Sequence, residues 1–217
     1  MWGAEPKRIA AAFAATAAAL VTMVARADDL PGAYGGHGVA FTYPSTWLHQ
    51  PGDFAYESGS SLWHEFFGPQ QAPPTTTPPP VDPTQPAPAP TPAPTPAPLY
   101  DLVAVVAYRT NVTITKKTLP RYKFALQLMV MRLAAQTGGQ VLSGPTRITL
   151  GRSKLPGYTF TVSTNLPDAP STVSRLVLVF NKKTEYFLNC QHVKDGPLAA
   201  EIDSGCAQVM QSFRLTK

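Results

Sequence analysis

Residues 39–47 have the sequence Val-Ala-Phe-Thr-Tyr-Pro-Ser-Thr-Trp. Large apolar side chains occupy every second position of residues 39–43, and this alternation predicts a β-strand with one apolar side. Pro44 cannot donate a ladder hydrogen bond and ends the strand. Trp47 follows after a short turn. The stretch therefore predicts a sheet that buries one side against a core.

Six further segments are rich in β-branched and aromatic residues and predict additional strands. They are residues 61–67, 102–108, 140–150, 158–164, 175–180 and 184–192. Residues 102–108 and 175–180 are almost entirely apolar, as expected of strands that are covered on both faces. In residues 158–164, Tyr, Phe and Val alternate with Thr, Thr and Ser, so one side is apolar and the other polar. Asn181-Lys-Lys183 predicts a hairpin turn between the last two strands.

Two helices are predicted. The first has Thr118 as its N-cap and Pro120 in its first turn, and it ends at Gly138-Gly139. Its expected buried stripe consists of Leu119, Tyr122, Leu126, Val130 and Leu133. The second helix begins near Pro197, and its expected buried face carries Ile202, Cys206, Val209 and Phe213. Strands and helices together predict an α+β chain.

A proline-rich tract interrupts this pattern. Residues 69–98 contain 14 Pro, no Lys or Arg, and Asp82 as the single acid. Such a segment favours extended polyproline II and has little apolar surface to bury, so we expect it to be disordered. Residues 28–68 are too few to fold alone without disulfides or metals. We therefore expect one α+β domain, made of residues 28–68 and 99–217, with residues 69–98 as a disordered insertion.

The N-terminus has the pattern of a secretory signal peptide, residues 1–27. Lys7 and Arg8 precede an uncharged, Ala-rich stretch, and Ala25-Arg26-Ala27 is a small-x-small cleavage site. Cleavage is expected between Ala27 and Asp28. The alternative is an uncleaved membrane anchor, although the apolar stretch is shorter than the ~20 residues that span a bilayer.

The two cysteines, Cys190 and Cys206, predict one disulfide, because an even count in an exported chain favours pairing. The inward face of the second helix would bring Cys206 to a strand that carries Cys190. Two free buried thiols, or half of a metal site, are the competing interpretations.

Charge argues against nucleic-acid binding. The chain has 18 Lys and Arg against 13 Asp and Glu, a net charge of +5. The basic residues are scattered, with Lys116-Lys117 and Lys182-Lys183 the only adjacent pairs after the signal peptide. Nucleic-acid binders usually concentrate this charge on one face. Solvated surface charge is the favoured interpretation.

The order of these elements resembles the PsbP/Mog1-like fold family. An early strand ends in Tyr43-Pro-Ser-Thr-Trp47, and a late helix closes with Gln211-Ser-Phe213. The resemblance covers about 160 residues, everything outside the signal peptide and the proline-rich tract. It implies a central antiparallel sheet with helices packed on its faces. Members include photosystem II extrinsic proteins, a Ran-binding protein, DcrB-like envelope proteins and actinobacterial exported lipoproteins, and most of them are binding or assembly factors. This chain lacks the lipid-acceptor Cys of the lipoproteins.

No familiar catalytic motif is present: the chain has no Gly-x-Ser-x-Gly, His-Glu-x-x-His or Ser-x-x-Lys. His64 and Glu65 are neighbours, but adjacent strand residues point to opposite faces and would not act together. We therefore expect no catalytic residue, no metal site and no cofactor.

An aromatic set lies on either side of the proline-rich tract. It consists of Trp47, Trp63, Phe66, Phe67 and Tyr100. Exposed aromatic side chains would form a partner surface. The alternative, which we favour, is that these aromatic side chains pack in the core of a small sheet.

These observations predict an exported, non-enzymatic binding or assembly module of the bacterial cell envelope, either secreted or held in the wall or periplasm. Its expected partner is an envelope protein or a wall component, with membrane contact only if the signal peptide is uncleaved. The first alternative is a structural or antigen-like secreted protein that acts through its proline-rich tract. The second is a hydrolase with an unrecognised site.

Overall fold

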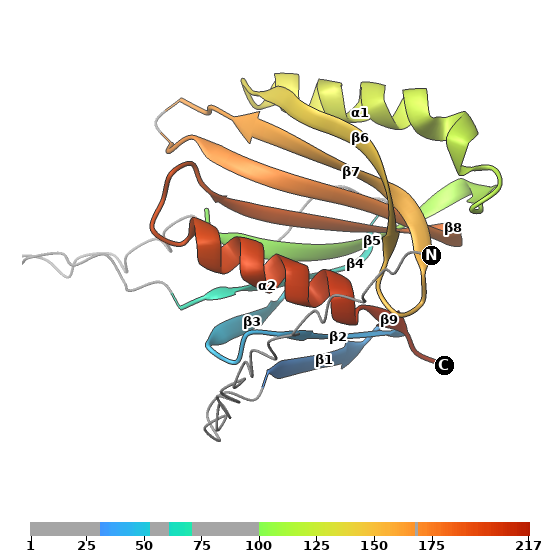
Figure 1. The fold of residues 1–217 in the computed structure, drawn as a ribbon, viewed down its shortest axis with the longest axis horizontal. Helices are drawn as coiled ribbons and strands as arrows, with labels where there is room; N and C mark the ends of the chain where they lie inside the picture. Colours follow the sequence, from blue (N-terminus) through green and yellow to red (C-terminus); the bar gives the residue numbers. More distant parts are fainter. Residues whose placement is uncertain (1–30, 53–60, 71–99, 168) are drawn as a thin grey trace, which may run out of the picture.

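The computed structural model describes residues 31–52, 61–70, 100–167 and 169–217 (Figure 1). The predicted signal peptide, its cleavage site at Ala27 and Asp28, and residues 71–98 of the predicted insertion lie outside these ranges. Pro69, predicted as the first residue of the insertion, is instead the last residue of a strand and pairs with Trp47. The elements are, in chain order, β1 (Gly32–Gly36), β2 (Val39–Tyr43), β3 (Trp47–Pro51), β4 (Ser61–Pro69), β5 (Leu102–Ile114), η2 (Leu119–Tyr122), α1 (Lys123–Gln136), β6 (Gln140–Leu150), β7 (Leu155–Thr164), β8 (Thr172–Val193), α2 (Ala199–Ser212) and β9 (Arg214–Leu215).

A six-stranded antiparallel sheet forms the centre, in the order β3-β4-β5-β8-β7-β6. A three-stranded antiparallel sheet, β1-β2-β9, lies beside it. Strand β4 pairs directly with β5, with Phe67 opposite Val103. The central sheet is therefore built from chain on both sides of residues 71–99. The predicted class, an α+β fold with a central antiparallel sheet, is confirmed.

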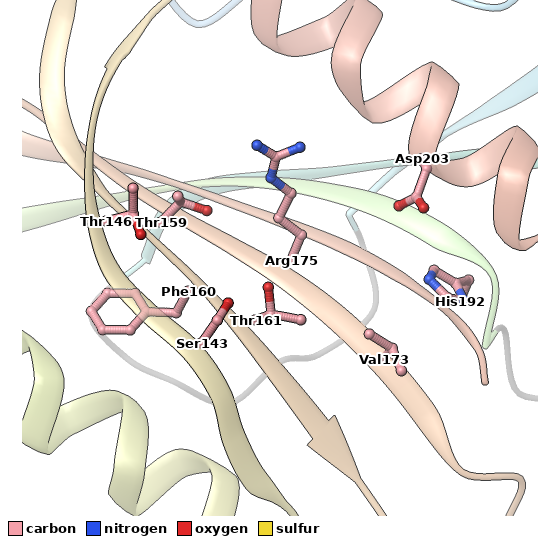
Figure 2. A pocket seen from close by; sticks show the side chains of 9 residues that line it. All are labelled: Ser143, Thr146, Thr159, Phe160, Thr161, Val173, Arg175, His192 and Asp203. Atoms are coloured by element: carbon pink, nitrogen blue, oxygen red, sulfur yellow. The ribbon is translucent and has the colours of Figure 1, made fainter.

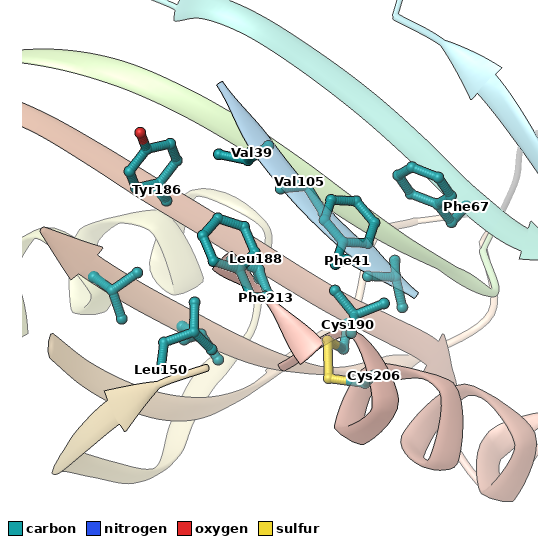
Figure 3. Close-up of a cluster of buried hydrophobic side chains, with 14 of the residues drawn as sticks. Val39, Phe41, Phe67, Val105, Leu150, Tyr186, Leu188, Cys190, Cys206 and Phe213 are labelled. Atoms are coloured by element: carbon teal, nitrogen blue, oxygen red, sulfur yellow. A yellow bond between two sulfur atoms is a disulfide. The ribbon is translucent and has the colours of Figure 1, made fainter. Parts of the chain in front are cut away.

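The main core lies between the central sheet and the layer formed by β2 and α2 (Figure 3). Phe41 of β2, Leu188 of β8 and Phe213 after α2 are almost completely buried there. The rings of Phe41 and Phe213 stack with centroids 6.0 Å apart. The alternation in residues 39–43 is explained by this core, because Val39 and Phe41 point into it.

A disulfide between Cys190 of β8 and Cys206 of α2 crosses the main core, as predicted (Figure 3). The two residues are separated by 16 positions in the chain. Closing a loop of this length stabilises the fold by roughly 3 kcal/mol in the chain-entropy account. The bridge therefore holds α2 against the sheet.

Helix α1 covers the opposite face of the central sheet, over β6 and β7 (Figure 1). Its buried residues Leu126, Val130 and Ala134 pack in a second core with Phe160 of β7. Two details of the prediction are wrong. Leu133 is 43% exposed, because Ala134 takes the inward position. Thr118 makes no side-chain capping bond to the helix and is instead bonded to Thr115.

The hairpin predicted at residues 181–183 is wrong, because β8 runs through them without a turn. The first half of β8 pairs with β7 and the second half pairs with β5. Lys182 has a positive φ of 57°, and the register with β5 shifts there, which makes a β-bulge. Because of the bulge, even-numbered residues of β8 point to one face of the sheet before it and to the other face after it. Leu178 therefore faces the α1 core, whereas Leu188 faces the α2 core.

Within the described ranges, no helix is both long and apolar enough to cross a membrane.

Candidate functional site

A pocket of about 360 Å³ opens on the face of the central sheet that α2 partly covers (Figure 2). Its lining comes from β6, β7, both ends of β8, and α2. We call it the concave pocket, and its lining residues are Ser143, Thr146, Thr159, Phe160, Thr161, Val173, Arg175, His192 and Asp203.

Strand alternation explains why this pocket is polar. In β7, Tyr158, Phe160 and Val162 belong to the core under α1. Their neighbours Thr159 and Thr161 therefore point to the other face and line the pocket. The sequence predicted this division of the strand. The sequence did not predict that α2 leaves these polar side chains of the sheet uncovered.

Arg175 is the permanent cation of the pocket, and its side chain is exposed. Asp203 of α2 and His192 line the wall on the α2 side (Figure 2). Neither Arg175 nor Asp203 forms an ion pair with another described residue. A guanidinium without a carboxylate partner suits a ligand carboxylate or phosphate, because its donors match two oxygens at once.

The polar groups of the pocket are not arranged as a nucleophile and base. His192 Nδ1 lies 2.9 Å from the carbonyl oxygen of Val193, and the Thr159 hydroxyl donates to the carbonyl oxygen of Leu176 at 3.0 Å. The described lining residues thus form no hydrogen-bonded Ser/Thr–His–acid set. The pocket can donate and accept hydrogen bonds to a bound polar molecule.

The structure divides the aromatic set between different environments. Trp47 and Phe67 are 4% and 1% exposed and belong to the main core, so neither can contribute to a partner surface. Trp63 is half-buried and stacks on His37. Phe66 lies on the other face of the sheet from Phe67, because adjacent strand residues alternate.

The remaining member, Tyr100, lies two residues before the start of β5 and is half-buried. Its carbonyl oxygen accepts a hydrogen bond from Gln191 Nε2 at 3.2 Å. A single partner surface made of all five aromatic residues is therefore wrong. Core packing, the favoured alternative, applies to Trp47 and Phe67.

A second polar cluster, which the sequence did not predict, joins the two sheets around Glu65. Its carboxylate is 8% exposed and accepts hydrogen bonds from three side chains. Tyr34 Oη donates to Oε1 at 3.0 Å, His37 Nε2 lies 3.2 Å from Oε1, and His49 Nε2 lies 2.7 Å from Oε2. We call these four residues the Glu65 cluster.

Each member of the Glu65 cluster comes from a different place: β1, the β1–β2 turn, β3 and β4. Burial, and next the hydrogen bond to Glu65, raise the pKa of the Tyr34 hydroxyl far above its usual value. One signal was available in the sequence, because Glu65 occupies an inward position between Trp63 and Phe67. Within the part of the chain that the structure describes, no group of three His, Cys, Asp or Glu is placed to hold a metal ion.

Glu185 lies outside both clusters, on β8 opposite Tyr108. Burial raises the pKa of its carboxyl from 4.5 to about 7. A raised folded-state pKa means that the folded protein holds this proton more tightly than the unfolded chain. The stabilisation that the protonated Glu185 carboxyl contributes is fully present below pH 4.5 and is lost as the pH rises through 7.

We therefore expect Glu185→Gln to be more stable than the parent at pH 8, by about 1–3 kcal/mol, and to reduce the difference between pH 5 and pH 8. Urea unfolding at the two pH values measures both quantities. Thr184→Val, at the neighbouring β8 position, exchanges two groups that do not titrate. It is the control and should leave the pH dependence of the parent intact. An identical pH slope in the parent and Glu185→Gln would contradict the expectation.

Comparison with known proteins identifies the class of fold. The solution structure of cyanobacterial PsbP (CyanoP) from Synechocystis sp. PCC 6803 matches with a TM-score of 0.51 at 10% sequence identity, over 86% of this chain and 93% of that chain. A crystal structure from Bacteroides thetaiotaomicron VPI-5482 matches with a TM-score of 0.45 at 9% identity, over 83% of this chain and 46% of that chain, so this chain spans about half of that protein. No protein-family model and no curated protein matches the sequence. The fold is PsbP-like, as the resemblance implied.

Proposed function

We propose that this chain is an exported, non-enzymatic binding module of the bacterial cell envelope, and that the concave pocket is its ligand site. The ligand we propose is a carboxylate-bearing, hydroxyl-rich component of the envelope, such as a peptide-substituted wall polysaccharide. The observation that carries the proposal is Arg175, a cation without a described acidic partner, in a concavity lined by hydroxyl groups.

The chemistry of the lining supports this ligand class. Arg175 supplies two parallel donors for a carboxylate. The hydroxyls of Ser143, Thr146 and Thr161 can donate or accept, and so they suit sugar hydroxyls. Asp203, across the pocket, would accept hydrogen bonds from hydroxyl or ammonium groups of the same ligand.

Two observations are compatible with export. The disulfide between Cys190 and Cys206 is of the kind that persists in oxidising compartments. The N-terminal pattern of residues 1–27 predicts a secretory signal peptide. Both support an extracytoplasmic setting for the pocket.

The test is a binding titration with soluble fragments of bacterial wall polymer that carry peptide carboxylates. We expect Arg175→Ala to weaken binding by about 10- to 100-fold, since a hydrogen-bonded charged contact contributes roughly 1.5–3 kcal/mol. Arg214→Ala, an exposed arginine on β9, is the matched control and should bind like the parent. Equal affinities of the parent and Arg175→Ala would refute the proposed site.

The alternative is that the protein acts through its proline-rich tract. Deleting residues 71–98 distinguishes this alternative from binding in the concave pocket. Loss of wall-fragment binding in a folded deletion variant would favour the tract. Binding that survives this deletion and is lost in Arg175→Ala would favour the concave pocket.

A further inference from the structure

Helix α1 has an apolar outer surface. Its inner face is accounted for by Leu126, Val130 and Ala134. On the outside, Phe124 is 76% exposed, Leu128 37% and Met131 50%. These three residues are spaced four and three apart, so they share one outward stripe. A helix on the surface of a globular protein normally presents polar residues on that side.

Two further apolar side chains of α1 are partly exposed beyond the stripe, about a quarter of a turn or more around the helix from Leu128. Met129 and Leu133 are 45% and 43% exposed, and the helix contains no acidic residue. An exposed apolar surface of this kind on a folded domain marks a site of interaction.

The stretch of chain that contains α1 carries charge of a single sign. Between Asp101 and Asp168 the chain contains no Asp or Glu and nine Lys or Arg. These are Arg109, Lys116, Lys117, Arg121, Lys123, Arg132, Arg147, Arg152 and Lys154. The segment comprises β5, α1, β6 and β7, so this stretch of chain carries nine positive charges and no negative charge, although the net charge of the whole chain is +5.

Several of these basic residues meet at the N-terminal end of α1. Lys116, Lys117, Arg121 and Lys123 are exposed there. Arg147 of β6 joins them, because its Nη2 donates to the carbonyl oxygen of Lys116 at 3.2 Å. The pairing of Ile114 with Lys182 brings the basic pair Lys182-Lys183 of β8 to the same end.

We propose that α1 docks the protein on an anionic lipid bilayer. Phe124, Leu128 and Met131 would insert below the headgroups, and the lysines and arginines at the N-terminal end of α1 would contact lipid phosphates. A second copy of the chain fits less well, because it would bring two basic surfaces together. An apolar stripe with a cluster of basic side chains at one end is the pattern that favours a negatively charged membrane surface.

The proposal goes beyond the proposed function and is compatible with it. Helix α1 and the concave pocket lie on opposite faces of the central sheet, since α1 packs on Phe160 and the pocket opens beside Thr159 and Thr161. A protein docked through α1 would keep the pocket facing away from the membrane. This contact does not depend on whether residues 1–27 are retained.

The test is binding of the full chain to vesicles of phosphatidylcholine alone and of phosphatidylcholine with phosphatidylglycerol, measured by co-sedimentation. Hydrogen exchange of α1 peptides locates the contact, which matters because residues 9–24 are themselves apolar. We expect exchange in residues 123–136 to slow only with the anionic vesicles, and the effect to weaken at high salt.

Matched variants test which side chains make the contact with the bilayer. Phe124→Ser combined with Leu128→Ser should reduce the α1-dependent binding at least about tenfold, because two large apolar side chains leave the lipid. Leu142→Ser, on β6 and 50% exposed, is the apolar control and should change binding less than about twofold. Lys116→Glu with Lys117→Glu should also weaken binding, whereas Arg214→Glu with Lys217→Glu should do so much less.

Two results would overturn the proposal. One is unchanged exchange of α1 in the presence of anionic vesicles on which the protein sediments, which would place the contact elsewhere in the chain. The other is lipid-free self-association that the Phe124→Ser, Leu128→Ser variant abolishes, which would assign the face to a second copy. Circular dichroism of each variant checks that these surface substitutions leave the fold intact.

Discussion

Gly205→Val is expected to destabilise the fold by about 3 kcal/mol or more, because it overpacks a closed interface. Gly205 lies on the inner side of α2, against the indole of Trp47. A Cβ at position 205 would overlap that ring. Trp47 cannot yield, because it is 4% exposed and its Nε1 donates to Glu201 Oε1 at 2.9 Å. The helix would have to move away from β3, and the main core would open.

Thermal and urea unfolding of Gly205→Val measure this effect. Ser204→Val is the matched control, since it makes the same β-branched residue at the preceding, exposed position of α2. It should cost less than about 1 kcal/mol, the range of helix propensity differences. Equal stabilities of the two variants would show that α2 does not pack on Trp47 as described.

Glu65→Ala is expected to cost about 3–4 kcal/mol, because it removes a buried charged acceptor and leaves its partners unpaired. The three donors, Tyr34, His37 and His49, come from both sheets. Their common acceptor therefore ties β1 and the β1–β2 turn to β3 and β4. Loss of Glu65 should loosen the three-stranded sheet first, which hydrogen exchange of residues 32–43 would detect.

Glu65→Gln is the conservative variant and should recover more than half of the loss, because an amide fills the same volume and keeps one carbonyl acceptor. Tyr34→Phe removes one of the three donors and should cost about 1 kcal/mol. A stability of Glu65→Ala within about 1 kcal/mol of the parent would contradict the role given to the Glu65 cluster.

The strands and helices that the sequence predicted correctly are those with strong local periodicity. Residues 140–150 form a strand with the predicted bounds, and the polar side of residues 158–164 became the wall of a pocket. The triplet 181–183 was misassigned for a physical reason. A turn and a bulge both favour a residue that tolerates positive φ, and only the pairing of β8 with two different strands distinguishes them.

Local sequence patterns could not predict contacts between segments that lie far apart in the chain. The Glu65 cluster brings together positions 34, 37, 49 and 65, each of which looks ordinary in its own segment. The sequence identified Leu126 and Val130 of α1 as inward-facing. It did not show that Phe124, Leu128 and Met131 stay uncovered on the outside, because that depends on what packs against the helix. The concave pocket depends on where α2 ends its coverage of the sheet, which is a property of the assembled fold.

The central claim is that the concave pocket binds an envelope component, and in-cell photo-cross-linking from within the pocket tests it most directly. A photoreactive residue replaces Thr161, with the same residue at exposed Thr216 as the control. We predict one reproducible adduct with a carboxylate-bearing wall component from position 161, lost with Arg175→Ala and retained when residues 71–98 are deleted. Two results would contradict the claim. One is that no adduct forms from position 161. The other is that the adducts are lost when residues 71–98 are deleted but are unchanged by Arg175→Ala.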